Sequence, residues 1–151
     1  PGQCVRRTEA RSGAAEDVAC EAAQSGHADR FLLDTIGELR CAYALADIAV
    51  IGRSFGDLHG SDPIEPIALG KATVIGPRHS DFESIVEAFR VAGAIEVVEA
   101  GQLGRLLSEL LADPARRAAM GEAGRRCVRE NQGATARHAQ MLLQLVGARA
   151  G

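Results

Sequence analysis

Short apolar runs alternate with amphipathic stretches along most of this chain. Runs typical of buried strands lie at residues 31–33, 48–51, 73–75 and 95–98. Between and after them, apolar residues recur at the spacing of one helix face, with Phe82, Ile85, Val86 and Phe89 as one clear example. The pattern predicts helices over residues 36–46, 63–69, 82–89, 103–111, 114–130 and 134–146.

This alternation of strands and helices is typical of βαβ units with a parallel sheet covered on both faces. The predicted fold class is therefore α/β, a doubly wound Rossmann-like parallel sheet with C-terminal helices. Because the strands are continuous apolar runs, we expect them to be fully buried. Ligands of such sheets bind beyond the carboxyl ends of the strands, which here are the loops after Leu33, Ile51, Ile75 and Val98.

The first part of the chain gives the weakest pattern. A short strand at residues 4–7 and a weak helix at residues 14–23 are the only elements expected there. We therefore divide the sequence into a poorly determined N-terminal segment, residues 1–29, and an α/β domain, residues 30–151.

Composition narrows the classes of function. The 151 residues are enough for one domain with a core. Lys and Arg number 17 against 20 Asp and Glu, for a net charge of −3, and there is one Tyr and no Trp. This excludes a strongly basic nucleic-acid binder with aromatic stacking platforms, so no nucleic-acid partner is expected. We find no secretion signal or membrane span, and expect the four widely spaced cysteines, at 4, 20, 41 and 127, to be reduced in a cytoplasmic protein, with Cys41 in the core.

Three predicted helices begin with capping signatures. Residues 35–38 and 80–83 follow the S/T-x-x-E pattern of a capping box, and residues 62–65 are its Asp variant with Pro63 at the first helical position. In one interpretation these are only caps, each worth about 1 kcal/mol. In the other, the helix starts converge to hold a phosphate, and the capping carboxylates accept hydrogen bonds from ribose hydroxyls.

The loop at residues 52–60 holds glycines at 52, 56 and 60, which allow a ligand close to the backbone. It matches neither the P-loop nor the dinucleotide fingerprint. The histidines at 27, 59, 79 and 138 lack metal-ligand spacing, so we expect no metal site, although His59 could be combined with Asp57 or Asp62. No G-x-S-x-G elbow surrounds a serine, which gives no support to a hydrolase.

Six segments resemble, in order and spacing, the C-terminal half of bacterial 3-deoxy-D-manno-octulosonate (Kdo) transferases. They are LDTIGEL (33–39), YALAD (43–47), GRSF (52–55), DPIEP (62–66), GP with DF (76–77 and 81–82) and NQGA (131–134). These GT-B glycosyltransferases move Kdo from CMP-Kdo to lipid A precursor at the cytoplasmic face of the inner membrane, in lipopolysaccharide biosynthesis. The resemblance covers about residues 30–146.

The resemblance implies a pocket for CMP or a CMP-sugar, with CMP-Kdo as donor substrate and no cofactor. The nucleotide-binding residues implied are Ile36, Gly37, Glu38, Ser54, Asp62, Pro63, Ile64 and Glu65.

The sequence also departs from the family pattern. Arg53 replaces a glycine, and Asp62 places an acid where the family has a neutral amide, so either Arg53 offsets that charge or the donor differs. The acceptor domain, with the family's catalytic carboxylate and membrane-associating surface, is expected to be missing.

We therefore expect no catalytic residue and no activity from this chain alone, and membrane contact only through the absent half. The chain would need the N-terminal domain or a partner chain, with a homo-oligomer left open. Two alternatives stay open: a GT-B domain for another nucleotide sugar, and a non-catalytic interaction module that retains the fold.

Overall fold

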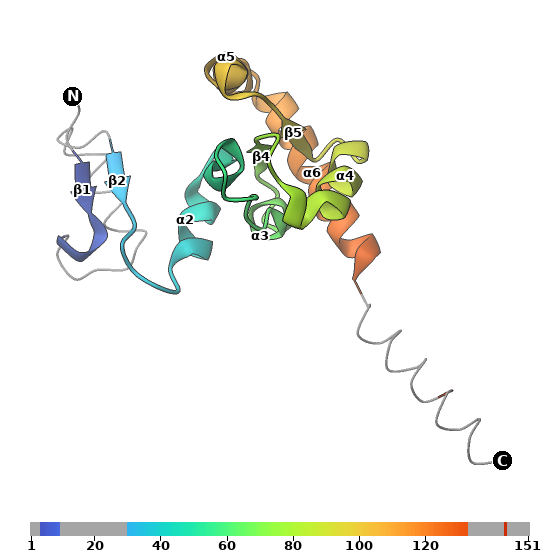
Figure 1. Cartoon of the computed structure of the whole chain (residues 1–151), viewed down its shortest axis with the longest axis horizontal. Helices are drawn as coiled ribbons and strands as arrows, with labels where there is room; N and C mark the ends of the chain where they lie inside the picture. The colour runs from blue at the N-terminus through green and yellow to red at the C-terminus, as the bar shows by residue number, and fades with distance from the viewer. Residues whose placement is uncertain (1–3, 10–29, 133–143, 145–151) are drawn as a thin grey trace.

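The computed structural model describes residues 4–9, 30–132 and 144. The helix expected at residues 14–23 lies outside the described residues, and so does the helix expected at 134–146, apart from residue 144. The described elements are strands and helices in alternation (Figure 1).

The strands form two parallel sheets. Strand β1 (Cys4–Arg6) pairs with β2 (Arg30–Leu32). Strands β3 (Ile48–Ile51), β4 (Ala72–Ile75) and β5 (Ile95–Val97) form a second sheet in the order β3-β4-β5. The predicted α/β class with a parallel sheet is thus confirmed, although the described strands form two sheets and not one.

The described residues also contain five numbered α-helices and three 3₁₀ turns. The α-helices are α2 (Leu39–Leu45), α3 (Ile64–Ala68), α4 (Glu83–Val91), α5 (Ala100–Ala112) and α6 (Pro114–Asn131). The turns are η1 (Arg7–Glu9), η2 (Gly52–Phe55) and η3 (Ser80–Phe82). Helix α6 begins as predicted, because the Asp113 side chain accepts a hydrogen bond from the Arg116 backbone N–H at 2.9 Å and Pro114 supplies the first residue.

Helices cover both faces of the three-stranded sheet. Alternate side chains of parallel strands point to opposite faces, so Ile51 and Ile75, which lie opposite each other in the register, share one face. That face packs against α3, α4 and α6 through Ile67, Val86, Phe89, Ala123 and Cys127. The opposite face, with Ala72 and Val74, packs against Leu110 of α5 and Met120 of α6.

Helix α5 confirms the leucine stripe at residues 103–111 with one exception. Leu110 is fully buried, and Leu103, Leu106 and Leu107 pack partly buried beside it. Leu111 is 59% exposed, because it lies beyond the edge of the face that meets the sheet.

The expectation that every strand is buried is wrong outside β4. All of β4 is buried, but every residue of β2 is exposed, and Val50 on β3 is 39% exposed. Cys41, expected in the core, is also exposed, since α2 packs beside α3 and buries none of its residues. An apolar run indicates that a segment can be buried. Whether it is buried depends on the elements that pack over it.

None of the helices in the described part of the chain combines the length and the apolar character that a membrane crossing requires.

Candidate functional site

The loops after β3 and β4 are joined at the carboxyl edge of the sheet. Ser54, which is fully buried, donates its hydroxyl to the Ile51 carbonyl at 2.5 Å and accepts the Gly76 N–H at 2.6 Å. The backbone N–H of Arg78 donates to the Ser54 carbonyl at 3.0 Å. These bonds hold the two loops side by side at the position where parallel sheets of this class bind ligands.

Ser54 was predicted to line the nucleotide pocket. Its hydroxyl has both of these backbone partners and its side chain is inaccessible. Any contribution of Ser54 to ligand binding therefore comes through the position of the loops and not through contact with its hydroxyl.

Residues 62–65 form the start of α3. The Asp62 carboxylate accepts the Ile64 backbone N–H at 2.8 Å, and Pro63 is fully buried beneath the turn. Asp62 itself is exposed and Glu65 is half-buried. The Asp62 side chain thus holds the turn before α3, but the N-cap residue of the helix is Pro63 and no side chain caps it, so the predicted capping box is not formed as such.

Tyr43 is a half-buried residue of α2, the helix that packs beside α3. Its pKa is raised, first by burial and then by the negative charges of Glu65 and Asp62. No local pattern singles out Tyr43 as a site residue, because its relation to α3 arises only from the packing of two helices. The charges of the two acids thus act on the Tyr43 phenol, which is neutral and can donate a hydrogen bond.

Residues 36–38 lie at the other end of α2. The Glu38 carboxylate accepts hydrogen bonds from the Thr35 hydroxyl and from the Arg7 guanidinium, the latter at 3.2 Å. These partners hold the Glu38 pKa below its usual value, the Thr35 hydroxyl contributing most. Ile36 is fully exposed, and Gly37 has a left-handed φ of 92°.

The other two predicted capping boxes are also wrong. The left-handed Gly37 stops the helix from extending back to Thr35, so α2 begins at Leu39 and the Thr35 hydroxyl binds Glu38. Ser80 likewise does not cap α4, since its hydroxyl shares a hydrogen bond with His59 Nδ1 at 3.2 Å.

The predicted pocket residues thus form two groups along the structure. The Glu38 carboxylate accepts a hydrogen bond from Arg7, which directly follows β1. Residues 62–65 form the second group, and the charges of Asp62 and Glu65 act on Tyr43. Figure 1 shows α2 between the β1–β2 pair and the rest of the fold.

A polar cleft of about 500 Å³ opens beside the second group. It lies between the loop that follows β3 and the loop that follows β4. Its lining residues are Asp57, His59, Pro77, Arg78, His79, Ser80 and Glu83. Sequence reasoning missed Arg78 and His79, although the neighbouring Gly76-Pro77 pair marked this loop. In the part of the chain that the structure describes, no cluster of three His, Cys, Asp or Glu side chains could hold a metal ion.

The backbone of the cleft is held in a specific conformation. His59 has a φ of 56°, which is rare for a residue with a side chain, and Gly60 follows with a φ of 94°. A Cβ at Gly60 would lie 3.1 Å from the His79 Cα, so the two loops are in close contact. His79 Nδ1 donates to the Gly76 carbonyl at 2.8 Å, which fixes the ring within the cleft wall.

Comparison with known sequences finds transferases. The chain is 37% identical over 122 residues to a 3-deoxy-D-manno-octulosonic acid transferase of Bordetella pertussis, a match that covers 80% of this chain and 28% of the relative. It is 33% identical over 111 residues to the enzyme of the same name from Haemophilus influenzae, covering 72% and 26%. No family model matches the chain.

Comparison with solved structures finds the same fold. The C-terminal CMP-Kdo binding domain of WaaA from Acinetobacter baumannii matches with a TM-score of 0.66 and 24% identity, over 84% of this chain and 61% of that one. Sucrose-phosphate synthase from Thermosynechococcus elongatus matches with a TM-score of 0.58 and 21% identity, over 88% and 34%. These likenesses establish a Rossmann-like domain of the GT-B type.

The chain spans about a quarter of the length of the curated relatives it matches. Within that span the sequence resemblance is confirmed, and the chain is homologous to part of the 3-deoxy-D-manno-octulosonic acid transferases.

Proposed function

We propose that this chain is the donor-nucleotide-binding part of a Kdo-transferring glycosyltransferase of lipopolysaccharide synthesis. The observation that carries the proposal is the 37% identity, over 122 residues, to a protein named as a Kdo transferase. The fold supports it, because its parallel sheet carries ordered polar loops at the carboxyl edge, where nucleotides bind in this architecture.

In this proposal the α3 start contacts the nucleoside. Glu65 lies half-buried in the first turn of α3, and its carboxylate can accept hydrogen bonds from the two ribose hydroxyls. Asp62, which holds the turn through the Ile64 N–H, sets the position of Glu65. Glu38 stands at the far end of α2 and is already bound by Thr35 and Arg7, so its predicted nucleotide contact needs a different side-chain arrangement.

We assign donor binding, and not sugar transfer, to this chain alone. Acid–base catalysis requires a titratable group within hydrogen-bonding reach of the acceptor hydroxyl. The family resemblance puts that group on the acceptor domain, across the interdomain cleft, so in this proposal transfer also requires that domain. In the same proposal, the enzyme acts at the cytoplasmic face of the inner membrane.

Nucleotide binding by the purified chain tests the proposal directly. A ligand that binds the native state raises Tm by mass action, so we expect CMP to raise Tm while UMP, GMP and AMP do not. Glu65→Gln should weaken CMP binding, measured by calorimetry, roughly tenfold, because a charge-assisted hydrogen bond to the ribose is lost. Glu109→Gln is the matched control, since Glu109 is a half-exposed glutamate on α5, away from α3.

The alternatives give different results. A response to UMP or GMP alone would indicate a GT-B domain for another nucleotide sugar. Absence of a response to any nucleotide would refute nucleotide binding and favour a non-catalytic module. Equal CMP binding by the wild type and Glu65→Gln would refute the proposed contact of Glu65 with the ribose.

A further inference from the structure

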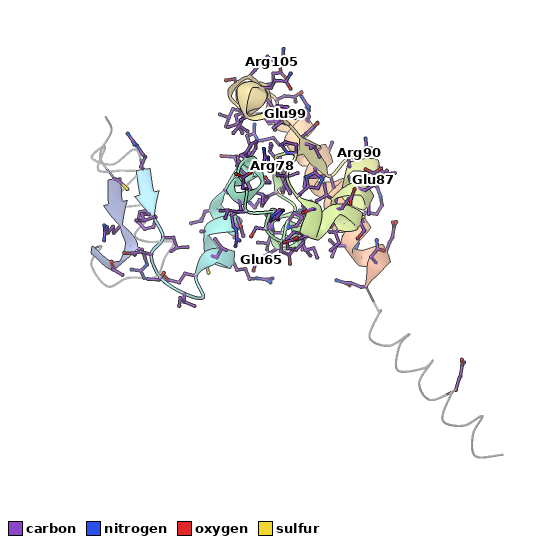
Figure 2. All side chains as sticks on the ribbon, in the orientation of Figure 1. Glu65, Arg78, Glu87, Arg90, Glu99 and Arg105 are labelled. Atoms are coloured by element: carbon purple, nitrogen blue, oxygen red, sulfur yellow. The ribbon has the colours of Figure 1, made fainter. Side chains whose placement is uncertain are left out.

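One arginine, Arg78, lines the polar cleft, and an exposed ion pair is what holds its side chain. The Arg78 guanidinium forms an ion pair with Asp57 across the mouth of the cleft (Arg78 is labelled in Figure 2). The two side chains are 62% and 88% exposed, respectively. Exposed ion pairs contribute little to stability, so a ligand that offers a better acceptor can displace Asp57 at small cost.

The rest of the lining suits a ligand with both an acid group and hydroxyls. His59 and His79 each use Nδ1 in a hydrogen bond within the protein, to Ser80 and to Gly76, which leaves each Nε2 available. Glu83, at the first turn of α4, also lines the cleft and has an exposed carboxylate that can accept hydrogen bonds from hydroxyl groups. Arginine binds a carboxylate through two parallel N–H bonds, which gives both affinity and orientation.

We propose that this cleft is the subsite for the carboxylate-bearing sugar of the donor, with Arg78 as its specificity-determining residue and Asp57 as the group that holds Arg78 until the sugar binds. The inference rests on the proposed function, since the relatives are named for an octulosonic acid, a sugar that carries a carboxylate. The strained backbone at His59 supports it, because such conformations persist where the surrounding structure enforces them and are common at ligand sites.

The nucleoside and the sugar of the donor would then bind at two different places along one edge of the sheet. The α3 start, with Glu65 and Tyr43, would bind the nucleoside, and the neighbouring cleft would bind the sugar acid. The two groups have different lining residues, so variants of the cleft should leave nucleotide affinity unchanged.

Calorimetry with the full chain tests the inference. The probes are free 3-deoxy-D-manno-octulosonic acid, D-mannose as a neutral sugar, inorganic phosphate, and CMP, and the first three are titrated with and without saturating CMP. We expect the wild type to bind the sugar acid and not D-mannose. Arg78→Gln should weaken sugar-acid binding roughly tenfold or more, and Asp57→Asn should strengthen it about twofold to threefold, because Arg78 is then released.

Arg105→Gln is the matched control for Arg78→Gln. Arg105 is also an exposed arginine with a glutamate partner, Glu109 at 3.6 Å, but it lies on α5 (labelled in Figure 2). The Arg105→Gln variant should bind the sugar acid as tightly as the wild type does. Because both arginines are exposed, their variants should unfold at the Tm of the wild type, which circular dichroism checks.

Three results would overturn the inference: no binding of the sugar acid by the wild type, equal binding by the wild type and Arg78→Gln, or phosphate bound as tightly as the sugar acid. The last result would assign the cleft to a phosphate group. Failure of CMP to bind, with Arg78-dependent binding of the sugar acid intact, would refute the proposed nucleotide site and leave the sugar-acid subsite standing.

Discussion

Replacing Gly76 by alanine tests whether the two loops of the candidate site are as closely joined as the structure shows. Gly76 follows β4 and is buried directly against Ser54. A Cβ at this position would lie 2.5 Å from the Ser54 carbonyl oxygen and 2.8 Å from its carbonyl carbon. Both atoms belong to the backbone, so relief requires that one of the loops move.

The cost follows from two effects. Overpacking in a well-packed region typically costs about 1–3 kcal/mol. Moving the loops apart also lengthens the bond from the Gly76 N–H to the Ser54 hydroxyl, a buried bond worth about 1 kcal/mol. Gly76→Ala should therefore lower the free energy of unfolding by about 2–4 kcal/mol, and Tm by roughly 5–15 °C for a chain of this length.

Urea denaturation followed by circular dichroism measures this difference. Gly52→Ala is the control, because it makes the same chemical change at the end of β3, where a Cβ would have no atom within 4 Å. We expect its stability to stay within about 0.5 kcal/mol of the wild type. If Gly76→Ala proves as stable as Gly52→Ala, the close contact between Gly76 and Ser54 does not exist in solution.

Two further measurements test the core and the charges that act on Tyr43. Leu110→Ala, at a fully buried position, should cost about 2–5 kcal/mol in a denaturation experiment, whereas Leu111→Ala, 59% exposed, should cost less than about 0.5 kcal/mol; equal costs would contradict the packing of α5. The chain has one tyrosine and no tryptophan, so the near-ultraviolet absorbance of tyrosinate reports Tyr43 alone. We expect ionisation above the ordinary pKa of 10.0 and a lower pKa in Glu65→Gln, and an unchanged pKa would show that the two groups are not neighbours. Because the folded-state pKa is raised, the stability linked to Tyr43 is fully present below the unfolded-state pKa and is lost as the pH rises through the folded-state value.

The central sheet could be predicted from the sequence because its signals are local. Strands β3, β4 and β5 coincide with apolar runs, and the start of α6 coincides with the Asp113-Pro114 pair, since a run or a cap acts through neighbouring residues. The exposure of β2 and of α2 could not be predicted, because burial depends on what packs over a segment and not on the segment alone.

In the candidate site too, local features could be predicted and contacts between distant segments could not. The position of the ligand edge followed from the fold class, and the turn that Asp62 holds before α3 followed from a local pattern. The cleft residues Arg78 and His79 could not be identified, because their partners, Asp57 and the backbone at Gly60, come from a loop about twenty residues earlier. Only the folded chain brings the two loops together.

Asp62 shows how fold and function can be separated at one residue. Its carboxylate holds the turn before α3 by accepting the Ile64 N–H, and an asparagine, the amide that the family resemblance leads one to expect, would accept the same bond. The local fold therefore does not require the negative charge, which instead acts on its surroundings, raising the pKa of Tyr43 together with Glu65. Arg53, the other departure from the family pattern, is exposed and forms no ion pair among the described residues, so its charge is available near the same edge. The charges of Asp62 and Arg53 are therefore not needed for the packing of this edge, and both side chains are exposed where a bound ligand would meet them.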